Sequence, residues 1–400
     1  MKTTLIQSAL LTTLLALQCE AAAIAPRDDN KIVAMDMQLA DPEEVADDGD
    51  LSKRDYIKND LKFKKNAYTV ELKIGSKKKK VKVAVDTGSS DLWVPTNNVQ
   101  CLDDVKCKKQ GTFQVSKSKT LKKLNEDFDI LYPDGTTASG EYVQDTIRFG
   151  KKKTLSNEEF AIVDKTNAEM GVLGIGLEDE EEVAGKDNKT YDNFVYSLKK
   201  AGYIDKAAYS LYFPEKDKKT GTIVFGGIDK DKYSGDLTTY KVSDKLTVPF
   251  ESVSLDKNDY KNNTDVLIDT ASRFSYLPKN VIEGIAKALD GSYNEDTGVY
   301  IVDCKKKNKK KFKDTFTFNF RNGLSIDAPG YQFVLKLKDI KDHMPKHEKN
   351  KCGLTIFPAD DESVLGDNFL RNAYVSVNLE DKSIGMAQVE HSKHHSYQSL

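Results

Sequence analysis

The sequence has little of several residue types, and each shortage excludes a class of protein. It contains only 5 cysteines, 10 prolines and 1 tryptophan in 400 residues, and its formal net charge is −2. This balance of charge gives no global field that would favour nucleic acid as a partner. The hydrophobic share of 38% and the aromatic share of 9% exclude a wholly disordered chain. A chain of this length can bury one large core or two ordinary ones.

Long apolar runs are also scarce, and the one long stretch lies at the N-terminus. There a lysine precedes LIQSALLTTLLALQC and the small residues Ala21–Ala23. The stretch contains Thr and Gln and is too short to span a bilayer, so the pattern predicts a cleaved secretory signal peptide over residues 1–23. The C-terminal HSKHHSYQSL lacks the hydrophobic tail of a lipid-anchor signal. We therefore expect a secreted, extracellular protein.

Cysteine usage agrees with export. Outside the predicted signal, four cysteines remain, and an even number in an oxidising compartment indicates two disulfides. Proximity in the sequence favours Cys101–Cys107 and Cys304–Cys352, while the two other pairings and free buried thiols stay open. No cysteine has metal-ligand spacing with a histidine, so we expect no metal site.

A polar, acidic stretch follows the signal and ends in the dibasic pair Lys53-Arg54. We interpret residues 24–54 as a propeptide and the pair as a processing site, with the mature chain starting near Asp55. A dibasic-cleaving processing protease would then be a partner, although self-cleavage is an alternative. The propeptide carries few lysines that could neutralise an acidic site.

From about residue 66 onward, side-chain character alternates with the period of two that is typical of β-strands. AYTVELKIG and KKVKVAV form a predicted hairpin with a basic tip, and further short strands are separated by turn signals. Helical stripes are few, at YDNFVYSLKKAG and NVIEGIAKALDG, each of which ends in glycine. The sequence thus predicts an all-β protein with a few short helices.

Two short motifs recur in the same order. AVDTGSS at residues 84–90 is echoed by LIDTASR at 267–273, and GVLGIG at 171–176 by SVLGDN at 363–368. Two repeats in register indicate two similar halves. A single Asp-Thr-Gly could be an Asx-turn at a strand end, but the duplicated motif resembles the pepsin-type aspartic proteases. LYPDGTTASG, VFGGID and VLGDNFLRNAYVSVNL extend the resemblance over most of the chain, which is most similar to the candidapepsins, the secreted aspartic proteases of yeasts.

The resemblance implies a bilobal pepsin-like fold, with an N-terminal lobe over 55–230 that carries Asp86 and a flap, and a C-terminal lobe over 231–400 that carries Asp269. It implies a secreted aspartic endopeptidase, made as a zymogen, which hydrolyses polypeptide substrates at acidic pH through a water activated by Asp86 and Asp269. We expect no cofactor, inhibition by pepstatin-type compounds, and a monomer.

Further site residues follow from the motifs that match the family. The residues expected to support the two aspartates are Thr87, Gly88, Ser89, Thr270, Ala271 and Ser272. The residues expected to form the flap and to bind substrate are Tyr132, Pro133, Asp134, Gly135, Thr136, Trp93, Ala84 and Arg273. Trp93 is either a partner of the flap tyrosine or a packing residue.

The sequence departs from the family at four of these positions. Ala271 replaces a usual glycine, and its Cβ requires suitable backbone dihedrals. Pro133 replaces a flap glycine and is expected to stiffen the flap. Arg273 is expected to bias the P3 subsite toward acidic or polar groups, and the small Ala84 is expected to deepen S1 for large aromatic side chains.

Several charged features remain. KKKK at 77–80 and CKKKNKKKFK at 304–313 are interpreted as solvated tips, with adhesion to an anionic wall polymer or membrane as the rival reading. EDEEE at 178–182 is expected to be a solvated loop, and the tail histidines to lie in solvent. Asn188 and Asn262 begin glycosylation sequons. Two functional alternatives stay open: a catalytically silent relative that binds peptide or polysaccharide, favoured by Ala271, and a yapsin-like processing protease selective for basic residues.

Overall fold

The computed structural model describes residues 31–40, 67–150, 152–187, 189–216, 218–341, 347–359 and 361–400. The predicted signal peptide, the dibasic pair Lys53-Arg54 and the sequon residue Asn188 lie outside this described part. The described chain consists mainly of β-strands with short helices, which confirms the predicted fold class. Among the described residues, no helix is both long enough and apolar enough to cross a membrane.

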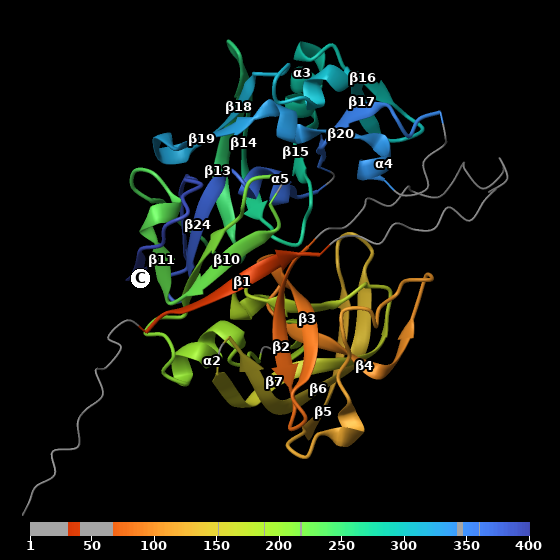
Figure 1. Cartoon of the computed structure of the whole chain (residues 1–400), viewed down its shortest axis with the longest axis vertical. Coiled ribbons are helices and arrows are strands. Elements are labelled where there is room, and N and C mark those ends of the chain that lie inside the picture. Colours follow the sequence, from red (N-terminus) through yellow and green to blue (C-terminus); the bar gives the residue numbers. More distant parts are fainter. Residues whose placement is uncertain are drawn as a thin grey trace, which may run out of the picture. The chain divides into compact units, whose positions relative to one another are not determined.

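The largest sheet combines strands from the whole length of the chain (Figure 1). Its strands follow one another in the order β12 (Thr238–Lys241), β25 (Ser383–Gln388), β24 (Ala373–Asn378), β9 (Ala208–Tyr212), β10 (Thr220–Phe225), β1 (Val33–Leu39), β2 (Tyr68–Ile74), β3 (Lys79–Asp86), β8 (Gly171–Gly174), β4 (Leu92–Cys101), β7 (Lys153–Thr166), β6 (Thr137–Phe149) and β5 (Lys122–Leu131). The first half of the chain therefore shares a sheet with two strands from its C-terminal end.

Smaller sheets come mostly from residues after 246. A seven-stranded sheet has the order β19 (Ser325–Pro329), β18 (Thr315–Phe320), β13 (Thr247–Leu255), β14 (Asn258–Ile268), β23 (Ser363–Leu365), β15 (Ser275–Leu277) and β22 (Ile356–Pro358). A four-stranded sheet has the order β16 (Ser292–Asn294), β17 (Val299–Val302), β21 (Cys352–Leu354) and β20 (Val334–Lys336). β11 (Gly227–Asp229) pairs with β26 (Tyr397–Ser399).

The described helices are short: α1 (Glu182–Asp187), α2 (Phe194–Lys200), α3 (Lys279–Ala288), α4 (Leu337–Ile340) and α5 (Asp367–Leu370). The two predicted helical stripes correspond to α2 and α3. Asn193 caps α2, because its side chain accepts hydrogen bonds from the amides of Val195 and Tyr196. α3 buries Val281, Ile282 and Ile285 on one face.

The internal repeat is confirmed by matching topology in the two halves. β3 runs parallel to β8, with Asp86 opposite Gly174, and β14 runs parallel to β23, with Ile268 opposite Leu365. Each Asp-Thr motif thus follows one strand whose parallel neighbour carries the second repeated motif. The favoured disulfides, Cys101–Cys107 and Cys304–Cys352, are both present.

One strand was not predicted. β1 lies within the segment interpreted as a propeptide, yet it pairs antiparallel with β10 from Val33 opposite Phe225 to Gln38 opposite Thr220. Its alternate residues, including Met35 and Met37, are buried. The sequence pattern did indicate this strand, since VAMDMQL alternates apolar and polar side chains with a period of two.

The C-terminal tail also differs from expectation. The tail histidines were expected to lie in solvent, and His394 and His395 are exposed. However, β26 extends the chain onto β11, and His395 contacts the buried carboxylate of Asp229 through Nδ1 over 2.7 Å. His391 Nδ1 lies 3.1 Å from the hydroxyl of Tyr212. A buried carboxylate is costly without a polar partner, and the tail supplies such a partner to Asp229.

Candidate active site

Two aspartates lie at equivalent places in the two halves. Asp86 is the last residue of β3, and Asp269 follows β14 directly. Asp86 is buried and Asp269 is partly buried, and the charge of Asp269 acts on the carboxyl of Asp86. A Cβ placed on Gly88 would lie 3.3 Å from Asp86 Oδ1 and 3.4 Å from Asp269 Cγ, so both acids converge on the same point of backbone. The structure therefore brings together the two aspartates that the repeat predicted.

Each carboxylate is held by the residues that follow it. Asp86 Oδ1 accepts from the amide of Gly88 at 2.8 Å, and Oδ2 from the hydroxyl of Ser89 at 2.5 Å. Asp269 Oδ1 accepts from the Ala271 amide at 2.7 Å, and Oδ2 from the Ser272 hydroxyl at 2.6 Å. These donors fix the orientation of both side chains without filling the space between them.

The two loops are joined through their threonines. The amide of Thr87 donates to Thr270 Oγ1 and the amide of Thr270 to Thr87 Oγ1, each over 3.1 Å. The hydroxyls continue to the opposite strands, from Thr87 to the Ile268 carbonyl at 2.5 Å and from Thr270 to the Val85 carbonyl at 2.7 Å. All the donors and acceptors of this buried motif are thereby satisfied, as a rigid site requires.

Burial and mutual repulsion control the protonation of the pair. Desolvation, followed by the charge of Asp269, raises the pKa of Asp86 above its usual range. Desolvation likewise raises the pKa of Asp269, against the hydrogen bonds from Ser272 and Ala271 that favour its charged form. Two adjacent buried carboxyls cannot both ionise at low cost, so the pair retains a proton at a pH at which an isolated aspartate has lost it.

Ala271 fits its loop. Its amide keeps the hydrogen bond to Asp269, and Ala271 is not among the described non-glycine residues with positive φ. The requirement for backbone dihedrals that suit a residue with a Cβ is therefore met. The observation that favoured a catalytically silent relative loses its physical basis.

The predicted flap is a turn between β5 and β6. The Tyr132 amide donates to the Thr136 carbonyl at 2.8 Å, the Gly135 amide donates to the Tyr132 carbonyl at 2.9 Å, and Gly135 has a φ of +79°. The Thr136 amide donates to Asp134 Oδ1 at 2.8 Å. Pro133 occupies the first central position of this turn, where its fixed φ is favourable.

Trp93 contacts the predicted flap. Its indole Nε1 donates to the hydroxyl of Tyr132 over 2.9 Å. Desolvation, followed by the charge of Asp86, raises the pKa of Tyr132. Trp93 is also fully buried, so it packs in the core and contacts Tyr132, whose role in a flap stays a prediction.

The two predicted specificity residues lie near the aspartates. Ala84 is buried on β3, two residues before Asp86 and on the same face of the strand. Arg273 contacts α4 and its own neighbour: its Nη1 donates to the Asp339 carbonyl at 2.8 Å, and its guanidinium lies 4.7 Å from the centroid of the Phe274 ring. Its S3 role, and the S1 role of Ala84, stay predictions.

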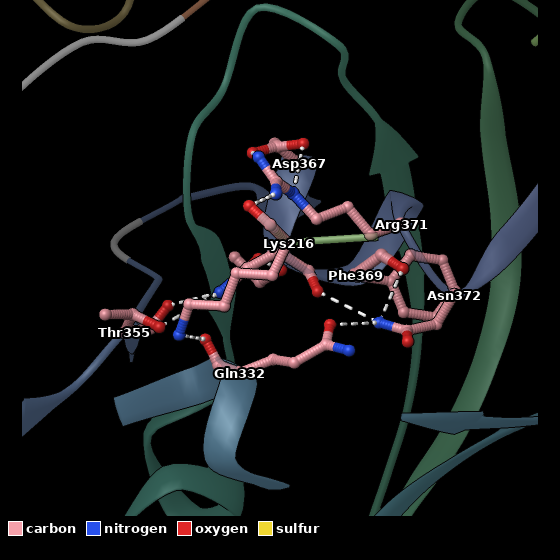
Figure 2. A network of polar contacts seen from close by, with 9 residues as sticks. Lys216, Gln332, Thr355, Asp367, Phe369, Arg371 and Asn372 are labelled. Carbon is pink, nitrogen blue, oxygen red and sulfur yellow. Dashed lines mark hydrogen bonds and ion pairs between the residues drawn. The ribbon is translucent and has the colours of Figure 1, made fainter. Parts of the chain in front are cut away.

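A polar network supports the second loop and was not predicted (Figure 2). Asp367 and Arg371 form a buried two-pronged ion pair, at 2.9 and 2.6 Å. The amide of Asp367 donates to the Ser272 carbonyl at 2.8 Å, and Arg371 Nη1 reaches the Lys216 carbonyl at 2.9 Å. The pair therefore positions the backbone of Ser272, which holds Asp269. The motif VLGDNFLRN marked this segment, but its i,i+4 ion pair was not recognised.

The acidic run EDEEE is partly buried, which corrects the expectation of a solvated loop. Glu181 is 2% exposed, and burial raises the pKa of its carboxyl to about 9. Burial raises the pKa of Glu180 to about 8. Asp91, also fully buried, accepts hydrogen bonds of 2.8 Å from the hydroxyls of Tyr142 and Tyr191. A cluster of acids whose pKa values are raised by burial therefore lies beside the first loop.

Comparisons with known proteins agree with this geometry. Residues 67–389 match the family described as eukaryotic aspartyl protease. The chain is 37% identical to secreted aspartic protease 5 of Candida albicans over 361 residues, which cover 88% of this chain and 82% of the relative. It is 36% identical to candidapepsin-4 of the same species over 354 residues, or 86% and 81% of the two chains. Secreted aspartic protease 8 of that species is 32% identical over 356 residues, or 87% and 82%.

Proposed function

Because this chain belongs to the eukaryotic aspartyl protease family and is similar to candidapepsins over most of its length, we propose that Asp86 and Asp269 are its catalytic pair. The chain is an aspartic-type endopeptidase whose substrates are polypeptides. The observation that carries the assignment is the convergence of the two carboxyls on Gly88, each carboxyl being supplied by one of the repeated loops.

The pair shares one proton when it is active. The ionised carboxylate acts as a general base toward a water molecule, and the protonated partner polarises the carbonyl of the scissile peptide bond. The water oxygen attacks the carbonyl carbon, a tetrahedral intermediate forms, and a proton passes to the leaving amine as the C–N bond breaks. The amide and hydroxyl donors of Gly88, Ser89, Ala271 and Ser272 keep both carboxyls in place during these transfers.

Tyr132 is proposed to close over the substrate, with its hydroxyl fixed by Trp93. The turn that carries it has internal hydrogen bonds, so it can move as one unit between β5 and β6. Closure would exclude water from the cleavage site and strengthen the polar contacts there.

We also propose that the protein is secreted as a zymogen. The signal-like residues 1–23, the acidic stretch up to Lys53-Arg54 and two disulfides support this proposal, as do relatives whose names describe them as secreted. Cleavage after Lys53-Arg54 by a dibasic-specific protease would release the mature chain, and the mature enzyme is proposed to be a monomer.

A preference for basic residues is a second candidate, supported by Asp134 on the flap. Desolvation raises the pKa of Asp269 and of Tyr276, and the charge of Asp134 adds to the rise in both groups. A flap acid whose charge acts on Asp269 would also stabilise a cationic substrate side chain. Peptides that differ only in Lys or Phe at P1, cleaved by wild type and Asp134→Asn, test this. A preference for Phe that is unchanged in the variant would contradict it.

The main proposal is tested by hydrolysis of denatured albumin between pH 2 and 7, with and without pepstatin. We expect cleavage in acid by the processed wild type, inhibition by pepstatin, and a loss of at least about a thousandfold in Asp269→Asn, as a missing member of a catalytic unit causes. Cleavage by Asp269→Asn at the wild-type rate would overturn the assignment.

A further inference from the structure

Lysines from three separate segments meet on one surface of the C-terminal half. We call it the lysine surface and define it by these residues: Lys305, Lys306, Lys307, Lys309, Lys310, Lys311, Lys313, Lys338, Lys349 and Lys351. Residues 303–313 contain seven lysines and one acidic residue, Asp303. Lys309, Lys310, Lys311 and Lys313 are all exposed.

The fold brings these segments together. The disulfide Cys304–Cys352 joins the first lysine run to β21, and β21 pairs with β20 so that Cys352 lies opposite Lys336. The Leu337 amide donates to the Lys351 carbonyl at 2.9 Å, which places α4 beside the third segment. β20 and α4 are neighbours along the same stretch of chain (Figure 1). The Cys304–Cys352 disulfide and the pairing of β20 with β21 therefore bring the lysines of the three segments close together.

Lysines outnumber the acids that approach them among the described residues of these segments. Lys305 lies 3.8 Å from Asp303, Lys307 lies 3.9 Å from Asp339, and Lys351 lies 2.7 Å from Glu348. The first two distances are at the outer limit of an ion pair, where exposed charges contribute little to stability. A cluster that keeps its net positive charge produces a local field that attracts anionic groups.

The lysine surface reaches the active site through two contacts. Lys307 approaches the carboxylate of Asp339, and the carbonyl of Asp339 accepts from Arg273. Arg273 follows Ser272, which holds the catalytic Asp269. Behind these groups, Phe274 and Ile340 pack in one apolar cluster, so α4 and the catalytic loop form a continuous support.

We propose that the lysine surface binds acidic segments of substrate polypeptides and holds them while the scissile bond lies between Asp86 and Asp269. The proposal rests on the proposed catalytic site and adds a class of preferred substrate: polypeptides with clustered aspartate or glutamate several residues away from the cleaved bond. The link to the catalytic loop favours a polypeptide, since one chain could then occupy both places.

Two peptides test the proposal. They share one cleavable core, and one is extended by six aspartates and the other by six asparagines. At pH 5 most aspartates are ionised while lysines remain charged. For the processed wild type at low ionic strength we expect kcat/KM to be about tenfold higher for the acidic peptide, within the range of electrostatic steering. The difference should lie in KM and disappear in 0.5 M salt.

The chain offers a matched control for charge removal. Lys309→Gln/Lys310→Gln/Lys311→Gln removes three consecutive exposed lysines from the lysine surface. Lys77→Gln/Lys78→Gln/Lys79→Gln removes three consecutive exposed lysines from the β2–β3 hairpin. We expect the first variant to lose about fivefold of its preference for the acidic peptide, in proportion to the field removed, and the second to keep it. Cleavage of the asparagine peptide should be unchanged in both variants.

Each other outcome contradicts the proposal in a distinct way. Equal cleavage of the two peptides by wild type would overturn the lysine-surface proposal alone, and equal losses in both triple variants would assign the preference to total charge. A sulfated polysaccharide that binds wild type but not the first variant, with peptide preference unaltered, would assign the surface to polysaccharide. Failure to cleave either peptide would overturn the catalytic assignment together with the inference that rests on it.

Discussion

Trp93 donates its indole N–H to the hydroxyl of Tyr132 over 2.9 Å, and thereby joins a buried core residue to the tip of the flap. Desolvation, followed by the charge of Asp86, raises the pKa of Tyr132. Tyr132, the predicted flap tyrosine, therefore lies within electrostatic reach of the proposed catalytic pair, while Trp93 fixes its hydroxyl.

Trp93→Phe should weaken catalysis by releasing Tyr132. Loss of one buried hydrogen bond of about 1.5 kcal/mol corresponds to roughly a tenfold lower kcat/KM. Steady-state hydrolysis of a peptide substrate measures this, and thermal unfolding reports any accompanying loss of packing. In a double-mutant cycle with Tyr132→Phe, the two losses should not add, because each variant removes the same bond. Additive losses would show that Trp93 acts by packing alone.

Gly88→Ala should impair the active site directly. The added methyl group would lie 3.3 Å from Asp86 Oδ1 and 3.4 Å from Asp269 Cγ, so the carboxyls would have to move. The required shift is a few tenths of an ångström, less than the misplacement of about 1 Å that costs about a hundredfold, so kcat should fall by about tenfold.

Ala271→Gly is the matched control at the equivalent place in the other loop. It retains the amide that donates to Asp269, so kcat should change by less than about threefold, the effect of added backbone freedom alone. If Gly88→Ala were as active as wild type, the two carboxyls would have more room than the structure indicates.

The buried acids should make the folded protein most stable in acid. Burial raises the pKa of Glu181 to about 9 and that of Glu158 to about 8, whereas an unfolded glutamate titrates near its ordinary value. Below that ordinary value both states are protonated and the stabilisation is complete. As pH rises, the unfolded state ionises first, so stability falls by up to about 1.4 kcal/mol per pH unit and per group until the folded pKa is reached.

Glu181→Gln should therefore reduce the loss of thermal stability between pH 5 and pH 8, since a neutral amide cannot ionise. Melting temperatures across this range measure the effect. Glu295→Gln, at an exposed position, is the control and should leave the slope unchanged. The same slope in all three proteins would mean that Glu181 ionises without cost in the folded state.

Local signals explain what the sequence could predict. Asp86 and Asp269 are each followed by their own donors within three residues, so short motifs contain most of the information about the dyad. The pairing of Cys101 with Cys107 is local for the same reason. The hairpin and the helices α2 and α3 follow from side-chain periodicity.

Features that depend on distant neighbours were missed. Glu181 lies within an acidic run of a kind that is usually solvated, and only its packing near Asp91 and Tyr191 shows that it is buried. The role of Arg371 requires the carbonyl of Lys216, 155 residues earlier. β1 was overlooked because its partner β10 lies more than 180 residues away, and the surrounding acidic stretch masked its alternation.

The place of β1 in the large sheet has a consequence for any cut between residues 41 and 66. Both ends of that interval are fixed, since the Ala40 amide donates to the Ala67 carbonyl at 2.9 Å. After scission β1 would no longer be tethered to β2 by the chain and would become a bound peptide, retained by its six residue pairs with β10. Dilution would then lower the fraction of molecules that keep β1 bound. Where β1 dissociates, the facing edges of β10 and β2 lose their strand partner, and a new chain end could pair with them.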